Sequence, residues 1–158
     1  MNKITSFTID HEKLLKGVYV SRKDSIKDIT LTTFDIRMKQ PNKEPVMNPA
    51  EMHTIEHLGA TFLRNHEKYK ESIIYFGPMG CRTGFYLIVS EDIDSTTILP
   101  LMKQMFEFIT NYDDIVPGSS PVECGNYQDM NLNMAKYESK LYLELLQNCS
   151  ETNLNYPN

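Results

Sequence analysis

Two histidines and a glutamate lie within one short segment, His53-Thr54-Ile55-Glu56-His57, which reads H-x-x-E-H. On a helix, side chains three or four residues apart share one face, with Cβ atoms about 5–6 Å apart. The two imidazoles could therefore bind the same divalent metal ion, with the carboxylate of Glu56 beside it. The same residue types also occur on solvated helix faces, so the metal interpretation needs support from the rest of the chain.

A helix from about Pro49 to Lys68 is predicted to carry this motif. Asn48 is a favourable N-cap, and Glu51 takes the third helical position, as in a capping box. Arg64 falls on the histidine side, two turns further on, where a guanidinium could hold an anionic group of a substrate. The apolar residues form a stripe on the opposite side, which would face the core: Met52, Ile55, Leu58 and Phe62.

The three cysteines, Cys81, Cys124 and Cys149, are an odd and sparse set that argues against a disulfide framework. Cys124 lies in a loop just before a predicted helix. One thiolate with two imidazoles suits zinc or ferrous iron and leaves one coordination position open, as in a catalytic site. The alternative for Cys124 is a buried free cysteine. Cys81 lies at a turn beside Arg82, whose charge would favour a thiolate, so Cys81 is either an acid/base or nucleophilic residue or a core thiol.

Length and composition are those of an ordinary globular protein. The 158 residues fit a single domain, 1–158, with 41% hydrophobic and 23% charged residues. The net charge is −5 and there is no basic tract, so nucleic acid is not an expected partner. No apolar run approaches the roughly 20 residues of a membrane span, and the N-terminus lacks the apolar core of a signal peptide. We therefore expect a cytoplasmic protein that does not contact a membrane.

The order of predicted elements indicates an α+β fold, a mostly antiparallel sheet with helices packed on one face. Pro100 is expected to kink the second helix or to mark an early boundary. The polar segment 151–158 is expected to be frayed. The predicted strands are 14–20, 26–39, 72–76 and 83–89, and the predicted helices are 49–68, 94–112 and 130–147.

Four further blocks accompany the H-x-x-E-H motif in a fixed order. They are Ser6-Phe7 with Asp10-His11, Phe34-Asp35-Ile36-Arg37 followed by Gln40-Pro41-Asn42, Pro78-Met79-Gly80-Cys81-Arg82-Thr83-Gly84-Phe85-Tyr86, and Glu123-Cys124-Gly125-Asn126-Tyr127. Each block is weak alone. Together, over nearly the whole chain, the five blocks resemble the S-ribosylhomocysteine lyase (LuxS) family.

This resemblance implies a homodimer with active sites at the subunit interface. It also implies an α/β sandwich like the metallohydrolase fold that the family shares with processing peptidases. One divalent metal would be bound per subunit, Fe²⁺ natively and Zn²⁺ or Co²⁺ in some preparations. The implied metal ligands are His53, His57 and Cys124. The implied catalytic acid/base residues are Cys81 and Glu56. The implied substrate-binding residues are Ser6, His11, Arg37 and Arg64.

The activity implied by the resemblance is cleavage of S-ribosylhomocysteine by two carbonyl migrations and a β-elimination. The products would be homocysteine, which returns to the methyl cycle, and 4,5-dihydroxy-2,3-pentanedione, the precursor of the quorum-sensing signal autoinducer-2. Two positions depart from the family pattern. Tyr75 stands where many members have aspartate, and Gly77 replaces a serine. These changes concern the amino-acid end of the substrate pocket.

Two other functions remain open. In an inverzincin-type peptidase, Glu56 would activate a metal-bound water between His53 and His57, and a downstream glutamate would usually supply the third ligand. A metal-stabilised binding module would instead close the metal shell with four protein ligands. The identity of the third ligand and the presence of an open position distinguish these alternatives.

Overall fold

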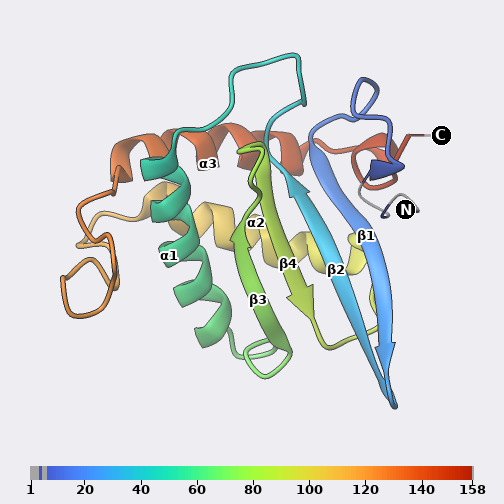
Figure 1. Ribbon diagram of the computed structural model, residues 1–158, viewed down its shortest axis with the longest axis horizontal. Helices are drawn as coiled ribbons and strands as arrows, with labels where there is room; N and C mark the ends of the chain where they lie inside the picture. Colours follow the sequence, from blue (N-terminus) through green and yellow to red (C-terminus); the bar gives the residue numbers. More distant parts are fainter. Residues whose placement is uncertain (1–3, 5–6, 158) are drawn as a thin grey trace.

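Four antiparallel strands form the centre of the computed structural model, which describes residue 4 and residues 7–157 (Figure 1). Their order across the sheet is β1-β2-β4-β3, so β1 and β3 are the edge strands. A two-residue turn joins β1 to β2, and β4 pairs with both β2 and β3. The strands are β1 (Gly17–Ile26), β2 (Ile29–Arg37), β3 (Ile73–Pro78) and β4 (Gly84–Val89).

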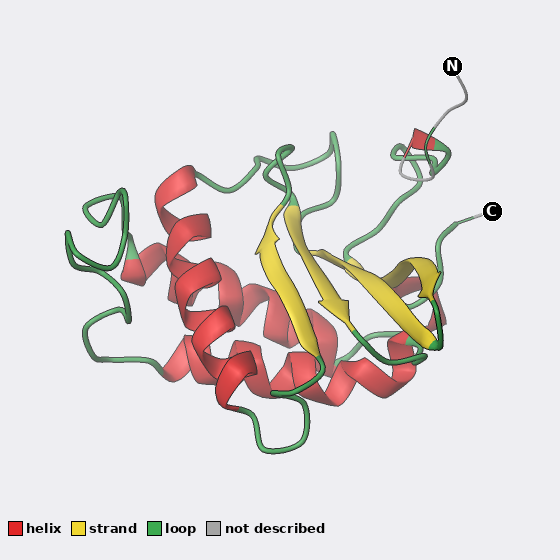
Figure 2. Ribbon diagram, turned by 60° about the horizontal axis from the view of Figure 1, so that its bottom comes forward, coloured by secondary structure: helices red, strands yellow, loops and turns green. Residues whose placement is uncertain are grey.

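Three helices lie on one face of this sheet. They are α1 (Pro49–Asn65), α2 (Ser95–Asn111) and α3 (Leu132–Gln147). In Figure 1, α2 and α3 cross behind the strands while α1 flanks β3, and Figure 2 shows the helices as a layer beneath the sheet. The predicted α+β fold, with an antiparallel sheet and helices on one face, is confirmed. No helix in the described part of the chain is long and apolar enough to cross a membrane.

Strand β2 separates the apolar core from a polar face. Successive side chains of a strand point to opposite faces. Phe34 and Ile36 therefore join the core beneath the sheet, while Asp35 and Arg37 lie on the other face. This alternation places two charged side chains beside one another on the face that the helices leave uncovered.

Besides shifts of one to three residues at several element ends, three larger details differ from the sequence prediction. Strand β1 begins at Gly17 rather than at residue 14 and runs on to Ile26, because the polar end of the β1–β2 hairpin pairs in solvent. Helix α2 starts at Ser95 and continues through Pro100, so this proline marks no boundary. The segment after α3 forms the short 3₁₀ helix η2 (Glu151–Asn153) and contacts the body of the protein, so the expectation of a frayed tail is wrong.

Candidate metal centre

Helix α1 presents His53, Glu56 and His57 on the face that points away from the core. All three are half-buried, whereas Ile55 and Leu58 on the opposite side are fully buried. The capping box predicted at Asn48 starts the helix at Pro49. Because the start and the buried stripe are both fixed, the direction of the H-x-x-E-H face is fixed as well.

Two backbone carbonyls hold the histidine rings. The Nδ1 atom of His53 lies 3.0 Å from the carbonyl oxygen of Asp129, and that of His57 lies 2.7 Å from the carbonyl oxygen of Pro117. A carbonyl can only accept, so each Nδ1 carries the proton and each Nε2 keeps a free lone pair. This arrangement orients a histidine as a metal ligand.

Cys124 completes a group of three donors. Its Sγ lies 3.4 Å from Nε2 of His53, and ligand atoms of His53, His57 and Cys124 lie within 4.8 Å of one another. With metal–nitrogen bonds of about 2.0–2.1 Å and metal–sulfur bonds of about 2.3 Å, tetrahedral ligand atoms are roughly 3.3–3.8 Å apart. The two imidazoles and the thiol therefore fit one divalent metal ion, with a fourth position left for another ligand.

Gly118 lets the loop before Cys124 pack against His57. Its φ is +72°, in the left-handed region, and an added Cβ would lie 3.0 Å from Nδ1 of His57. A residue with a side chain would be strained there and would crowd the imidazole. Gly118 and the carbonyl of Pro117 are parts of the site that the sequence analysis missed, because neither belongs to a ligand motif.

Glu56 lies in a groove between two parts of the molecule. On one side is the metal group, by which we mean His53, His57 and Cys124, and on the other is the turn after β3. Together with His53, Glu56 lines a cavity that contains His57 and Cys124, and also a neighbouring cavity. The second cavity is lined by Met79, Gly80 and Arg82, among others. Among the described residues, the Glu56 carboxylate has no hydrogen-bond or ion-pair partner. It is therefore free to exchange protons with a molecule bound in the groove.

Cys81 lies at the turn between β3 and β4, next to this groove. Its Sγ is 3.0 Å from Oγ1 of Thr83 and 3.7 Å from Nη1 of Arg37. Burial raises the pKa of the Cys81 thiol, but hydrogen bonds from Thr83 and the charge of Arg37 outweigh this effect and lower the pKa below its ordinary value. The expectation that the adjacent Arg82 supplies the cation is wrong, since Arg37 on β2 does so and Arg82 lines the groove.

Arg37 is held in place by a buried ion pair with Asp35. Its Nε and Nη2 donate to the two carboxylate oxygens of Asp35 at 3.0 and 2.6 Å, and its Nη1 donates to Thr83 at 2.5 Å. Arg37 is 3% exposed and Asp35 is 1% exposed. The guanidinium predicted to bind substrate is thus engaged mainly with Asp35, Thr83 and Cys81.

The other predicted substrate residues lie away from the metal group. His11 lies in the segment before β1, and β1 is the edge strand opposite to β3 (Figure 1). Arg64 lies about 10 Å along the helix axis from His57, and its guanidinium donates to the carbonyl oxygens of Ile73 and Ile74. Ser6 lies outside the described residues. Within one chain, the structure therefore brings together His53, Glu56, His57 and Cys124, but not His11 or Arg64.

Comparisons with known proteins point to one family. A family model described as S-ribosylhomocysteinase (LuxS) matches residues 4–153. The chain is 60% identical over 157 residues to an S-ribosylhomocysteine lyase of Clostridium acetobutylicum, covering 99% of both chains. It is 59% identical to the protein of that name from Finegoldia magna and 57% identical to that from Borreliella burgdorferi, each over 157 residues and at least 99% of both chains.

Proposed function

The chain belongs to the LuxS family of enzymes, and we propose that it cleaves the thioether of S-ribosylhomocysteine. The products are homocysteine and 4,5-dihydroxy-2,3-pentanedione. The observation that carries this proposal is the convergence of two oriented imidazoles and a thiol beside the carboxylate of Glu56. A second thiol with a lowered pKa, Cys81, lies between Gly80 and Arg82, which line the neighbouring cavity.

The chemistry explains why two proton carriers are needed. The carbon–sulfur bond at C5 of the ribose can break by elimination only when the neighbouring C4–H lies beside a carbonyl. The carbonyl begins at C1 and must move to C2 and then to C3, and each move transfers a proton between adjacent carbons. Removal of the C4 proton then forms the C4–C5 double bond and expels the homocysteine thiolate, which takes up a proton. The enol that remains tautomerises to the dione, so no external oxidant or reductant is consumed.

We assign the metal ligands as His53, His57 and Cys124. A divalent ion held there, Fe²⁺ by the family resemblance with Zn²⁺ or Co²⁺ as substitutes, supplies Lewis-acid stabilisation to a substrate oxygen that gains negative charge. The Pro117 and Asp129 carbonyls keep both Nε2 atoms available for this role.

Glu56 and Cys81 are assigned as the two acid/base residues. The two side chains approach the groove from different elements, Glu56 from α1 and Cys81 from the β3–β4 turn, so they can serve different carbons of the sugar. Thr83 and Arg37 favour the thiolate of Cys81, the form that can accept a proton.

We further propose a homodimer in which each groove is completed by the partner chain. The helices cover only one face of the sheet, and the other face exposes Tyr75 (47% exposed) beside a cavity lined by residues that include Tyr86 and Ile88. Since His11 precedes the edge strand β1, whereas α1 packs against the opposite edge strand β3, we assign His11 to the groove of the partner chain. Ser6 and Arg64 are assigned to substrate binding by the same resemblance.

The peptidase alternative is less well supported. Its third metal ligand would be a carboxylate, whereas the donor that meets the two imidazoles is the thiol of Cys124. Glu123, the nearest carboxylate in sequence, accepts a hydrogen bond from Ser120 at 2.5 Å.

One assay tests the proposed function directly. Anaerobically purified, metal-loaded protein is incubated with S-ribosylhomocysteine, and free thiol is followed with a chromogenic disulfide. The natural chain should release one thiol per substrate, and a Cys81→Ala variant should keep its metal but release none. Absence of thiol release by the natural chain, or near-normal release by Cys81→Ala, would overturn the proposal.

A further inference from the structure

The C-terminal segment after α3 is attached firmly to the sheet. The side chain of Asn153 donates to the carbonyl of Lys16 at 2.9 Å. The hydroxyl of Tyr19 lies 3.3 Å from the carbonyl of Thr152. Gly17 gives this segment room, because a Cβ there would collide with the backbone of Asn153. The segment therefore has a defined position against β1, on the edge of the sheet opposite to α1.

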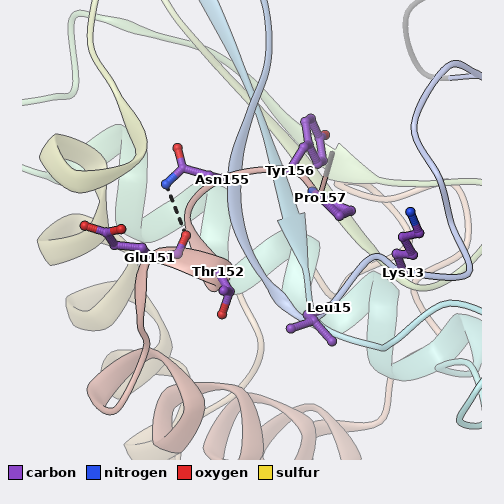
Figure 3. Close-up of a pocket in the computed structure, with 7 residues that line it drawn as sticks. All are labelled: Lys13, Leu15, Glu151, Thr152, Asn155, Tyr156 and Pro157. Carbon is purple, nitrogen blue, oxygen red and sulfur yellow. Dashed lines mark hydrogen bonds between the residues drawn. The ribbon is translucent and has the colours of Figure 1, made fainter.

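This attachment brings Tyr156 onto the polar face of the sheet. Figure 3 shows Tyr156 on the C-terminal segment, lining one pocket together with Leu15 and Lys13 of the segment before β1. The ring of Tyr156 stacks on Tyr19, with centroids 4.7 Å apart and 13° between the ring planes. Its hydroxyl donates to Oδ2 of Asp35 at 2.9 Å. Oδ2 is the same oxygen that accepts from Nη2 of Arg37.

We propose that Tyr156 is a positioning residue that acts on Cys81 through the buried Asp35–Arg37 ion pair. This inference rests on the acid/base role proposed for Cys81. Asp35 binds two nitrogens of the guanidinium, Nε and Nη2. The third nitrogen, Nη1, is left to donate to Thr83 and Cys81. A hydrogen-bonded path thus runs from the last residues of the chain to the catalytic thiol.

The charges of Asp35 and Arg37 determine how loss of the Tyr156 hydroxyl would change the pKa of Cys81. A buried carboxylate needs donors for its oxygens, and the Tyr156 hydroxyl supplies one of them. Without it, Asp35 draws the Arg37 guanidinium more strongly to itself, and the negative charge of Asp35 is less well compensated. Both changes disfavour a thiolate at Cys81, so its proton is lost at higher pH.

Few other titratable groups are coupled to the Asp35–Arg37 ion pair. Among the described residues, and apart from Tyr156 and Cys81, the charges of the ion pair act on the pKa of Tyr19 of β1, Tyr86 of β4 and Tyr142 of α3. Burial and then the charge of Asp35 raise the pKa of each of these tyrosines. All three are consequently neutral near pH 7, which leaves Arg37 as the cation that acts on Cys81.

The test is the pH profile of Cys81 alkylation in the full-length, metal-loaded protein. Iodoacetamide reacts with the thiolate, and mass spectrometry of the Cys81 peptide separates this reaction from that of Cys149. Tyr156→Ala should move the midpoint up by about one pH unit, which slows alkylation roughly tenfold below the midpoint. Tyr156→Phe, which keeps the stacked ring, should move it in the same direction, with alkylation about threefold slower. Tyr137→Phe, on the exposed surface of α3, is the control and should match the natural chain.

A merely structural role for Tyr156 would lower the melting temperature and leave the alkylation midpoint in place. Midpoints for Tyr156→Phe and Tyr137→Phe that coincide would therefore overturn the inference, whether or not Tyr156→Ala folds. Alkylation needs no substrate, so this outcome is separate from failure of the proposed function. That failure would appear as absent thiol release by the natural chain.

Discussion

The hydroxyl of Tyr75 lies over Gly77, in the space that a Cβ atom at position 77 would fill. Both residues belong to β3, and both stand where the sequence resemblance indicates departures from the LuxS pattern. The contact links the two departures, because the tyrosine ring can take this position only where residue 77 has no side chain. The tyrosine at position 75 and the glycine at position 77 therefore depend on each other.

A double-mutant cycle tests this link. Gly77→Ala should destabilise the natural chain by about 1 kcal/mol, at the lower end for overpacking, because the half-exposed Tyr75 ring can swing into solvent. In a Tyr75→Ala background the same change should have almost no effect. Urea unfolding of the four proteins gives the coupling energy. Equal effects of Gly77→Ala in the two backgrounds would show that the residues are independent.

Local periodicity explains how much of the metal centre could be predicted from the sequence. The capping box at Asn48 and the spacing of His53, Glu56 and His57 lie within one helix, so the helix and its outward face followed from neighbouring residues alone. Cys124 reaches the two histidines only because the long loop after α2 returns to α1. The spacing of residues in the sequence could not establish this contact. The resemblance to a family supplied that ligand.

The surroundings of Cys81 show why the remainder could not be predicted. Its cation was expected from sequence adjacency at Arg82, but the register of β2 against β4 brings Arg37 to the thiol instead. The carbonyl of Pro117 is a backbone atom, which any residue could supply. The polar tail was expected to be frayed from composition, whereas specific contacts of Tyr156 with Tyr19 and Asp35 fix it.

Gly118 should be necessary for tight metal binding. In Gly118→Ala, the added methyl group would press on Nδ1 of His57 and disturb its hydrogen bond to Pro117. Because groups that orient a ligand typically contribute 10–100-fold to metal affinity, we expect zinc affinity to fall about tenfold. Competition with a chromogenic chelator measures this change.

Gly125 offers a matched control for this substitution. It follows Cys124 directly, yet a Cβ there would meet no atom within 4 Å outside the two neighbouring residues. Gly125→Ala should therefore bind zinc as the natural chain does. Equal affinities for the Gly118→Ala and Gly125→Ala proteins would remove Gly118 from the site.

Mixing two inactive variants should restore activity if the groove is shared between subunits. Cys81→Ala lacks a catalytic residue, and His11→Ala lacks a residue that the partner chain would contribute. A heterodimer of the two has one site with both defects and one intact site. Since random reassortment makes half of the dimers mixed, we expect about a quarter of the natural activity.

The complementation experiment needs subunit exchange, which brief unfolding and refolding of the mixture provides. Light scattering of the natural chain should give twice the mass of one 18.3 kDa chain. A refolded mixture with no more thiol release than either variant alone would indicate that His11 acts within its own chain or has no role.

Thr83 should control the pH at which Cys81 becomes a thiolate. Its hydroxyl accepts from Arg37 and so directs its own proton to the Cys81 sulfur, which lowers the pKa of that thiol. Thr83→Val keeps the shape but removes this donor, so the pKa should rise by about one unit and the alkylation profile should shift to higher pH. Thr83→Ser keeps the hydroxyl and should retain the natural profile. If the valine and serine variants titrate together, the lowered pKa of Cys81 comes from Arg37 and the backbone of Thr83 rather than from the Thr83 hydroxyl.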